Sequence, residues 1–228
     1  MELSPRLLKI TQLVPKGARL ADIGTDHAYI PVYCLLEGII ESALAMDVNI
    51  GPLKRADANI EKFGFKGRIE TRLSDGLSNL KPDEADVIVI AGMGGLLIRD
   101  ILEKGKDVIG QDTLLILQPM IAPAELRIYL YSNGFDVIDE YVVSEENKFY
   151  NIFVVKKGHF KPSFEHIYIG KNLIKNSPET IRAYLEYKIR VCSGIVNGME
   201  KSENPDYDQI GHTRAELKIY ETARKELK

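Results

Sequence analysis

Short apolar runs alternate with stretches of helical spacing through the first two thirds of the chain. This alternation predicts crossover units and a mostly parallel sheet, which is typical of an α/β fold. One run, residues 86–91, is almost continuously apolar, as expected for a strand that is buried on both faces. The seven expected strands are residues 19–23, 42–47, 68–73, 86–91, 113–118, 135–143 and 150–156.

The segments between these strands have the spacing of helices. Pro52 falls in the first turn of one of them, where a missing N–H group costs nothing, and Asn133-Gly134 ends another. The last two strands alternate around the polar turn 145–148, so we expect the sheet to finish with an antiparallel hairpin. The four expected helices are residues 29–37, 52–63, 96–103 and 123–132.

The pattern changes after Gly158-His159. Two sets of apolar residues recur there at helical spacing, the first being Ile181, Leu185, Ile189, Cys192, Val196 and Met199 and the second Ile210, Leu217, Tyr220 and Leu227. The sets predict two amphipathic helices that pack antiparallel. We therefore expect an α/β domain over residues 1–160 and a small all-helical domain over 161–228. A helical hairpin that only supports the larger domain would give the same pattern.

Length and composition narrow the class of protein. At 228 residues and 25.6 kDa, the chain is long enough for one full domain and a smaller one. Its apolar runs are far shorter than the roughly 20 residues that a bilayer requires, and no apolar leader follows Glu2, Arg6 and Lys9. Cys34 and Cys192 are isolated, so a disulfide framework is not expected. We expect a mature cytoplasmic protein without a membrane segment.

Charge is distributed unevenly along the chain. The formal net charge is −3, which does not by itself favour a nucleic acid partner. Residues 1–160 hold 18 Lys and Arg against 23 Asp and Glu, whereas residues 161–228 hold 12 against 10. The helical part is therefore mildly basic, which permits an RNA partner without requiring one.

The segment 22–27 is the first candidate for chemistry, because it follows the first expected strand. Open parallel sheets bind ligands beyond the carboxyl ends of their strands. A phosphate cradle would need several glycines here, but only Gly24 is present and Asp22 and Asp26 are acidic. An acidic loop suits a ligand with a positive centre, such as the sulfonium and ammonium of S-adenosylmethionine. A simple turn at the end of a strand is the alternative.

Two further acids follow the next two strands. Asp47 ends the second strand, where an acid can accept both ribose hydroxyls of an adenosyl ligand. Asp75-Gly76 follows the third strand and can reach the adenine amino group. Each acid alone is compatible with an ordinary loop residue. Three acids at the ends of three successive strands face one crevice, and this combination favours a binding site.

At this point the sequence resembles the bacterial tRNA (adenine(22)-N1)-methyltransferases, the TrmK family. The motifs that carry the resemblance are Asp22-Ile-Gly24-Thr-Asp26-His27-Ala-Tyr29-Ile-Pro31, Ala45-Met46-Asp47-Val-Asn49, Leu73-Ser-Asp75-Gly76, Ile90-Ala-Gly92-Met-Gly94-Gly95 and Leu117-Gln118-Pro119. The resemblance implies a class I, Rossmann-like S-adenosylmethionine domain followed by a helical, coiled-coil-like domain. It also implies methylation of N1 of an adenosine in the D-arm of tRNA, in the cytoplasm.

The candidate site residues follow from these positions and from the resemblance. We expect a cofactor-binding set of Asp22, Gly24, Thr25, His27, Asp47, Val48, Asn49, Asp75, Gly76, Gly92, Met93 and Gly94. The glycines after the fourth strand would let the backbone approach cofactor or base closely, although a tight turn would also explain them. Many amino-group methyltransferases carry an Asn/Asp-Pro-Pro-aromatic element at this place. Since Gly92-Met93-Gly94-Gly95 replaces it, that mechanism does not transfer to this chain.

Two residues are expected at the target base. N1 of adenine attacks the methyl carbon directly, so alignment supplies most of the catalysis, and the base has to be unpaired or flipped out. The Asp26 carboxylate can accept a hydrogen bond from the adenine amino group and offset the charge that methylation creates. Tyr29 can stack on a ring, and His27 can contact base or cofactor. Alternatively, Asp26 and His27 only hold the loop.

Basic residues of the helical part are the candidate contacts for a nucleic acid partner. Phosphate contacts are expected from basic residues of the helical part, with tyrosines among them: Lys161, Lys171, Lys175, Arg182, Lys188, Arg190, Tyr184 and Tyr187. A solvated helix face is the alternative. His159, His166 and His212 have no Cys or carboxylate neighbours at ligand spacing, so no metal is expected. The oligomeric state stays open, and a monomer is compatible with the sequence.

Three other functions compete with tRNA methylation. A small-molecule methyltransferase would use the same fold, but a small acceptor needs no basic helical platform. A non-catalytic RNA-binding module could keep the cofactor pocket, although the intact acids Asp22, Asp47 and Asp75 argue against it. A nicotinamide oxidoreductase is disfavoured because the glycines of its fingerprint are missing after Gly24, and the segment that starts at Gly92 does not supply them, since Leu97 stands at the last glycine position.

Overall fold

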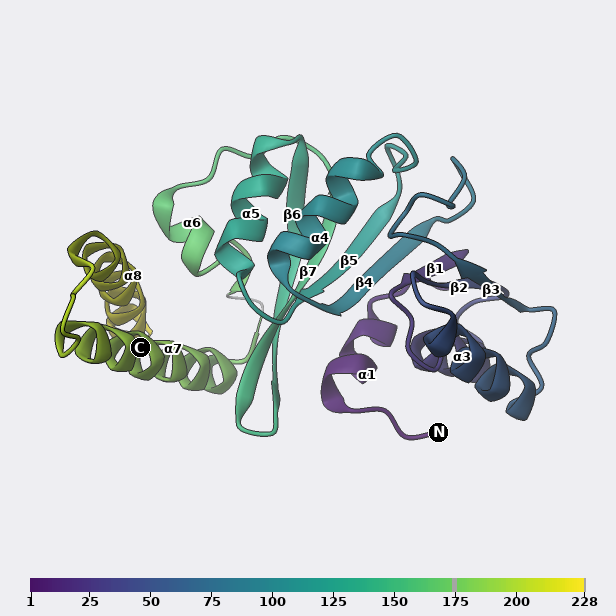
Figure 1. Ribbon diagram of the computed structural model, residues 1–228, viewed down its shortest axis with the longest axis horizontal. Helices are drawn as coiled ribbons and strands as arrows, with labels where there is room; N and C mark the ends of the chain where they lie inside the picture. Colours follow the sequence, from purple (N-terminus) through teal and green to yellow (C-terminus); the bar gives the residue numbers. More distant parts are fainter. Residues whose placement is uncertain (174–175, 228) are drawn as a thin grey trace.

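The protein is built around one seven-stranded sheet (Figure 1). A computed structural model describes residues 1–173 and 176–227. The strands are β1 (Leu20–Ile23), β2 (Ala43–Asp47), β3 (Ile69–Leu73), β4 (Val87–Met93), β5 (Leu114–Pro119), β6 (Phe135–Glu145) and β7 (Lys148–Lys157). Their spatial order is β3-β2-β1-β4-β5-β7-β6. The seven predicted strands and the α/β class are confirmed.

Strand directions follow from the way the chain connects the strands. The first five strands are parallel, because a helix or a longer connection returns the chain between them. β7 runs antiparallel to both β5 and β6. The predicted hairpin is therefore present, and its strands extend closer to the turn than expected. Since β6 runs in the same direction as β5, the hairpin tip lies at the carboxyl-end edge of the sheet.

Helices cover both faces of the sheet. The helices that pack on the sheet are α1 (Pro5–Gln12), α2 (Tyr29–Leu36), α3 (Ile50–Lys62), α4 (Gly95–Lys104), α5 (Pro123–Ser132) and α6 (Phe164–Tyr168), the last of which follows the predicted domain boundary at residue 160. Buried residues of α1, α2 and α3 belong to the core on one face. Buried residues of α4, α5 and α6 belong to the core on the other. The result is a three-layer arrangement that buries the apolar strands from both sides.

Neither α1 nor α6 was expected from the sequence, and the fourth strand ends later than predicted. Ser4 and Pro5 are nevertheless a helix start signal, with Pro at the first helical position. The fourth strand was expected to end at Ala91 but continues to Met93 through a register shift, and Gly92 in the shifted segment has a φ of 78°. A left-handed backbone of this kind is natural for glycine, so the strand bends there without ending.

The C-terminal part is a helical hairpin of α7 (Pro178–Glu200) and α8 (Tyr207–Glu226). Ion pairs join the end of α7 to the start of α8, Glu200 with Arg214, and the start of α7 to the end of α8, Glu186 with Arg224. The two helices are therefore antiparallel, as predicted. They share a core with Val142 of β6, so the hairpin packs against the end of the sheet (Figure 1).

A buried ion pair lies where the sheet meets the helical part. The side chains of Arg127 on α5 and Glu140 on β6 are fully buried and bonded to each other. Arg127 Nη1 also donates to the carbonyl oxygen of Ile167 in α6, at 2.8 Å. A buried charge pair needs such additional hydrogen bonds to offset its desolvation. It therefore fixes α6 against the sheet.

Candidate active site

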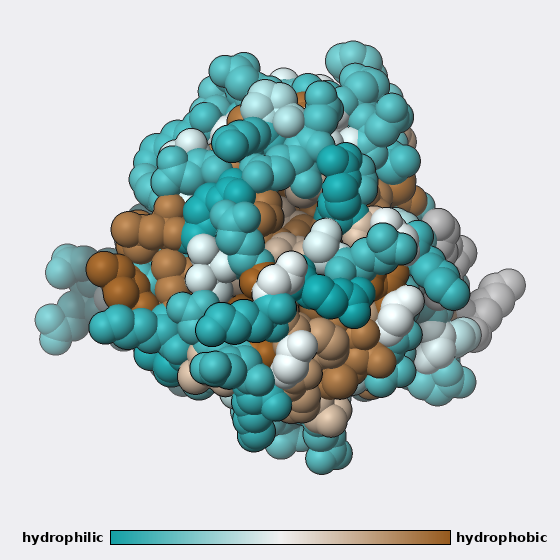
Figure 2. All heavy atoms as spheres, turned by 90° about the vertical axis from the view of Figure 1, so that its right-hand side faces the viewer, coloured by the Kyte–Doolittle hydropathy of each residue, from teal (hydrophilic) through white to brown (hydrophobic). Residues whose placement is uncertain are grey.

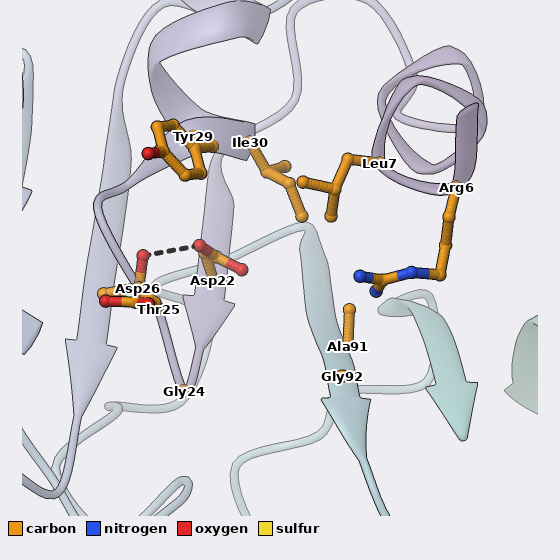
Figure 3. Close-up of a pocket in the computed structure, with 10 residues that line it drawn as sticks. All are labelled: Arg6, Leu7, Asp22, Gly24, Thr25, Asp26, Tyr29, Ile30, Ala91 and Gly92. Atoms are coloured by element: carbon orange, nitrogen blue, oxygen red, sulfur yellow. Dashed lines mark hydrogen bonds between the residues drawn. The ribbon is translucent and has the colours of Figure 1, made fainter. Parts of the chain in front are cut away.

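A cavity of about 290 Å³ opens at the carboxyl ends of β1 and β4 (Figure 3). Six predicted site residues line it, namely Asp22, Gly24, Thr25, Asp26, Tyr29 and Gly92. The other lining residues are Arg6, Leu7, Ile30 and Ala91. The cavity lies at the sheet edge where open parallel sheets bind ligands.

Asp22 is the acidic group of this cavity. Its side chain sits at the end of β1, and the residue is only 5 % exposed. The Thr25 hydroxyl donates a hydrogen bond of 2.7 Å to Asp22 Oδ2. The pKa of the Asp22 carboxyl is raised to about 6, chiefly by burial, with a smaller contribution from the nearby charge of Asp47 and against the opposing effect of the Thr25 bond. A carboxylate that has lost its water in this way favours a cationic partner.

The turn after β1 requires glycine at position 24. Gly24 has a φ of 73°, and the N–H groups of Gly24 and Thr25 both donate to the carbonyl oxygen of Met46, at 2.7 and 2.9 Å. A Cβ on Gly24 would lie 1.9 Å from Met93 Cε. The turn is therefore pinned to β2 from one side and covered by a β4 side chain from the other.

The loop before α2 is strained and held by its neighbours. His27 and Ala28 have φ values of 65° and 53°, in the left-handed region that non-glycine residues rarely adopt. Asn59 of α3 donates to the carbonyl oxygen of His27 at 2.7 Å. The rings of His27 and Tyr29 stack with centroids 5.0 Å apart. Strain that the surroundings maintain in this way is common at functional sites.

Asp26 is exposed and faces a cation. Its Oδ1 accepts hydrogen bonds from Arg55 Nε at 3.0 Å and from Arg55 Nη2 at 2.8 Å. His27 Nε2 lies 3.7 Å from the same oxygen. The contacts of Asp26 therefore hold the loop, while Oδ2 has no hydrogen bond within the described residues.

Two thirds of the predicted cofactor-binding residues lie outside the cavity lining, and these are His27, Asp47, Val48, Asn49, Asp75, Gly76, Met93 and Gly94. Asp47 accepts the N–H of Asn49 at 2.7 Å and lies close enough to Asp22 to affect its pKa. Asp75 instead pairs with Lys104 of α4 at 3.5 Å. Of the three acids, Asp22 and Asp47 are neighbours, whereas Asp75 is directed toward α4.

Among the glycines after Ala91, Gly95 is required by close packing and Gly92 by its left-handed backbone. The Gly92 N–H donates to Gln118 Oε1 at 3.0 Å. A Cβ on Gly94 would touch the side chain of Ile121 at 3.5 Å, and one on Gly95 would lie 2.3 Å from the carbonyl oxygen of Ala122. Gly95 therefore allows a tight start of α4, as the turn interpretation predicted, while the close approach of cofactor or base at Gly92, which lines the cavity, stays a prediction.

Sequence reasoning missed one charged residue of the cavity. Arg6 of α1 lines it, and Arg6 Nη1 donates to Gln118 Oε1 at 2.6 Å. No motif marks an arginine in this position, because its role depends on how α1 packs across the ends of β4 and β5. The helix start signal at Pro5 was the one available indication.

The expected phosphate-binding surface is smaller than predicted. Lys161, Arg182 and Arg190 are exposed. In contrast, Lys171 pairs with Asp136, Lys188 pairs with Glu216, and Tyr184 is 1 % exposed. The prediction was wrong for Tyr184, which is buried; Lys171 and Lys188 are half-buried and paired with carboxylates, and their contact with phosphate stays a prediction. Lys175 lies outside the described residues.

Cys34 and Cys192 are buried free thiols, and burial raises their pKa to about 12 and about 11. Among residues 1–173 and 176–227, no three His, Cys, Asp or Glu side chains come together as a metal site. Over the same residues, no helix has the length and hydropathy needed to cross a bilayer.

Comparisons with known proteins agree with this geometry. Residues 3–153 match a methyltransferase domain family. The Bacillus subtilis tRNA (adenine(22)-N(1))-methyltransferase is 39 % identical over 76 % of this chain and 73 % of its own. A Streptococcus pneumoniae structure solved with S-adenosyl-L-methionine shares 32 % identity, with a TM-score of 0.86 over 98 % of this chain and 100 % of that one.

A second solved structure is similar to this chain over its full length. Mycoplasma capricolum TrmK, in complex with S-adenosyl-homocysteine, shares 26 % identity and covers 100 % of both chains with a TM-score of 0.81. The similarity therefore includes the helical hairpin as well as the sheet. Together with the sequence relationship to the Bacillus enzyme, this establishes that the chain belongs to the tRNA (adenine(22)-N(1))-methyltransferase family.

Proposed function

We propose that the protein transfers a methyl group from S-adenosylmethionine to N1 of adenosine 22 in the D-arm of tRNA. The observation that carries the proposal is the buried Asp22 carboxylate, which faces a cavity at the end of β1 in a chain of this family. The cofactor is S-adenosylmethionine, the macromolecular substrate is tRNA, and the activity belongs in the cytoplasm.

The residues present fit this cofactor. The Asp22 carboxylate is desolvated and accepts one protein hydrogen bond, so it suits an ammonium group. Asp47 at the end of β2 would accept hydrogen bonds from the ribose hydroxyls. Val48 and Ile50, 57 % and 59 % exposed, offer apolar surface beside it for an adenine ring. Asp75-Gly76 at the end of β3 completes the proposed adenosine side.

Figure 2 gives a view of the side of the molecule that carries β3 and α3. Hydrophilic residues dominate it, and hydrophobic residues appear as separate patches (Figure 2).

The reaction places few chemical demands on the protein. S-adenosylmethionine supplies, when bound, a methyl group activated by its sulfonium. Gly92 and Gly94 present backbone without side chains, so a base can approach closely. The Asp26 carboxylate, whose Oδ2 is available, would accept a hydrogen bond from the adenine amino group. It would also offset the positive charge that develops on the ring. Tyr29, 39 % exposed, offers a face for stacking.

No side chain is needed as a base for this chemistry. N1 of neutral adenine carries a lone pair and no proton, so Asp26 would act by orientation and electrostatics alone. N1 lies on the pairing edge of adenine. The nucleotide would therefore leave its helix before the reaction.

We also propose that the two parts of the chain have different functions. Residues 1–160 form the catalytic domain, and residues 161–228 support tRNA binding. Arg182 and Arg190, both exposed on α7, are the proposed phosphate contacts. Two alternative functions each need only one of these parts. A small-molecule methyltransferase would not need the basic helical part, and a non-catalytic RNA-binding module would not need the catalytic site.

Transfer of labelled methyl to unmodified tRNA transcripts tests the proposal. One transcript carries adenosine at position 22 and the other guanosine. We expect label only in the adenosine transcript, with 1-methyladenosine after digestion. Label in neither transcript, despite measured cofactor binding, would favour the alternatives. Equal label in both would place the modification at another nucleotide.

A further inference from the structure

Four exposed apolar side chains lie at the carboxyl ends of β4 and β5. Leu96 and Leu97 belong to the first turn of α4, and Met120 and Ile121 follow directly after β5. Ile121 is the most exposed of the four, at 70 %. Apolar side chains that gather in this way on one edge of a protein typically mark a surface that binds a partner.

The backbone that carries Met120 and Ile121 is fixed by the neighbouring strand end. The Met120 N–H donates to the carbonyl oxygen of Met93 at 2.8 Å, and the carbonyl oxygen of Ile121 accepts the Gly95 N–H at 2.9 Å. The next residue, Ala122, has a φ of 56°, in the left-handed region that a residue with a Cβ rarely adopts. Such strain persists only where the surroundings maintain it. The two exposed side chains therefore project from a rigid support.

This segment borders the cavity on the side of β4. Gln118 Oε1 accepts the N–H of Gly92, a residue of the cavity lining (Figure 3), and Gln118 Nε2 lies 3.5 Å from Met120 Sδ. A Cβ on Gly94 would lie 3.5 Å from Ile121 Cγ1. A single residue therefore separates Met120 and Ile121 from the lining of the cavity.

The same surface continues toward the helical hairpin. A cleft of about 400 Å³ lies between α5 and the hairpin, and its lining includes Ala122, Ile128 of α5 and Ile195 of α7. Both isoleucines are exposed, as is Arg190 on α7, which is a proposed phosphate contact. An RNA whose backbone lies along α7 therefore reaches the cavity across the exposed apolar residues.

We propose that Ile121, supported by Met120, is an apolar wedge that enters the base stack of the tRNA where the target adenosine leaves it. This inference rests on the proposed function, because the nucleotide has to leave its helix only if N1 of adenosine accepts the methyl group. Ile121 is a positioning residue. It acts on the equilibrium between the stacked and the flipped base and takes no part in methyl transfer.

The physical basis of the wedge is the cost of opening the stack. A flipped nucleotide loses its stacking and pairing, and the faces of the neighbouring bases become exposed to water. An apolar side chain inserted at this step covers those faces, as other proteins do with isoleucine, leucine or methionine. Isoleucine is stiff about χ1, so Ile121 on its fixed backbone loses little conformational entropy when it enters the stack.

Two tRNA transcripts that differ in the pairing of adenosine 22 test this inference on the full-length protein. The opposite nucleotide is uridine in one and cytidine in the other, so flipping costs less in the second transcript. We expect Ile121→Ala to lower kcat/KM at least about tenfold on the paired transcript and less than about threefold on the mismatched one. Ile121→Leu should restore most of the activity, because it keeps an apolar side chain of the same size.

Fluorescence of 2-aminopurine in place of adenosine 22 follows the flipping step itself, because stacking quenches this base. The wild type should raise the fluorescence of the paired RNA, and Ile121→Ala should raise it less. Ile138→Ala is the matched control, since Ile138 of β6 is also exposed but lines neither the cavity nor the cleft. It should match the wild type in both measurements. Both alanine variants should bind S-adenosylmethionine like the wild type.

The outcomes separate this inference from the proposed function. If Ile121→Ala lowers kcat/KM equally on both transcripts, or leaves the paired transcript at the wild-type value, the inference is wrong. Sedimentation that shows a dimeric wild type and a monomeric Ile121→Ala, with equal effects on both transcripts, would assign the surface to a second copy of this chain and also overturn it. If the wild type binds S-adenosylmethionine but methylates neither transcript, the proposed function itself fails.

Discussion

The side chain of Met93 covers the α-carbon of Gly24, so that a Cβ at position 24 would lie 1.9 Å from Met93 Cε. The contact joins the turn after β1 to the end of β4, the two strands that border the cavity. Two sequence motifs separated by about 70 residues, the acidic turn and the glycine-rich strand end, therefore constrain each other.

Gly24→Ala should destabilise the protein through this contact. A left-handed residue with a Cβ costs about 1–2 kcal/mol, and displacement of Met93 adds to that. Gly17→Ala is the control, since Gly17 has a φ of 80° and nothing within 4 Å of a Cβ. Chemical denaturation should show a larger loss for Gly24→Ala than for Gly17→Ala. In a Met93→Ala background the two losses should become similar, and a persistent difference would contradict the explanation.

The strands and most helices could be predicted because their signal is local. Apolar periodicity located seven strands, and α5 has the predicted bounds 123–132. α6 was missed because it has five residues and its capping box uses His166, not Glu or Gln, as the partner of Ser163. A signal of this length cannot be distinguished from a turn.

The candidate site was predicted less completely than the fold. Asp22 and Gly24 were found because the end of a parallel strand is a known ligand position. Arg6 and Gln118 depend on the packing of α1 across the sheet, which no local pattern encodes. Lys188 has the same sequence character as Arg190, yet tertiary packing turns it inward to Glu216.

The raised pKa of Asp22 predicts a pH-dependent stability. Its folded pKa of about 6 lies above the ordinary value of 3.8, so the folded state binds this proton more tightly than the unfolded chain. The unfolding free energy therefore falls as pH rises from about 4 to 6, by up to about 3 kcal/mol. The Asp22→Asn variant has no carboxyl group at this position, so its unfolding free energy should not show this fall with pH. Denaturation at pH 4.5 and 7.5 should show the variant gaining relative to wild type at the higher pH.

Asp22→Asn should weaken cofactor binding, although it is expected to stabilise the fold at the same pH. Asp22→Asn removes the proposed ammonium partner, so the variant should bind S-adenosylmethionine more weakly at pH 7.5. Wild-type affinity should also decline below about pH 6, where the carboxylate becomes protonated. An unaltered affinity for the variant would remove Asp22 from the binding site while leaving the stability prediction intact.

The pair Arg127 and Glu140 should behave as a buried unit. Glu140→Gln leaves the Arg127 charge uncompensated, at a cost of roughly 3–5 kcal/mol. The double variant Arg127→Met with Glu140→Gln should lose less than the sum of the single losses. Glu186→Gln provides the comparison, because its partner Arg224 is partly exposed and such pairs contribute about 0–1 kcal/mol. Additive losses in a denaturation-based double-mutant cycle would mean that the two side chains act independently.

Asp26 should affect turnover without affecting cofactor binding. If its carboxylate orients the target base, Asp26→Ala should lower kcat on tRNA at least about tenfold. The affinity for S-adenosylmethionine should stay near the wild-type value. Glu61→Ala, which removes an exposed acid of α3, is the control. A wild-type kcat for Asp26→Ala would leave this residue with the loop-holding role that its bonds to Arg55 already provide.

The exposed arginines of α7 should determine how tRNA binding responds to salt. Each phosphate contact steepens the dependence of log K on log salt by about 0.7–0.9, so Arg182→Gln with Arg190→Gln should lower affinity and flatten the slope by up to about 2. Lys188→Gln has the same charge change, but its Nζ lies 3.5 Å from Glu216, inside the helical hairpin. That variant should lose stability and keep the wild-type salt slope. A wild-type slope for the double arginine variant would place the tRNA contacts on another surface.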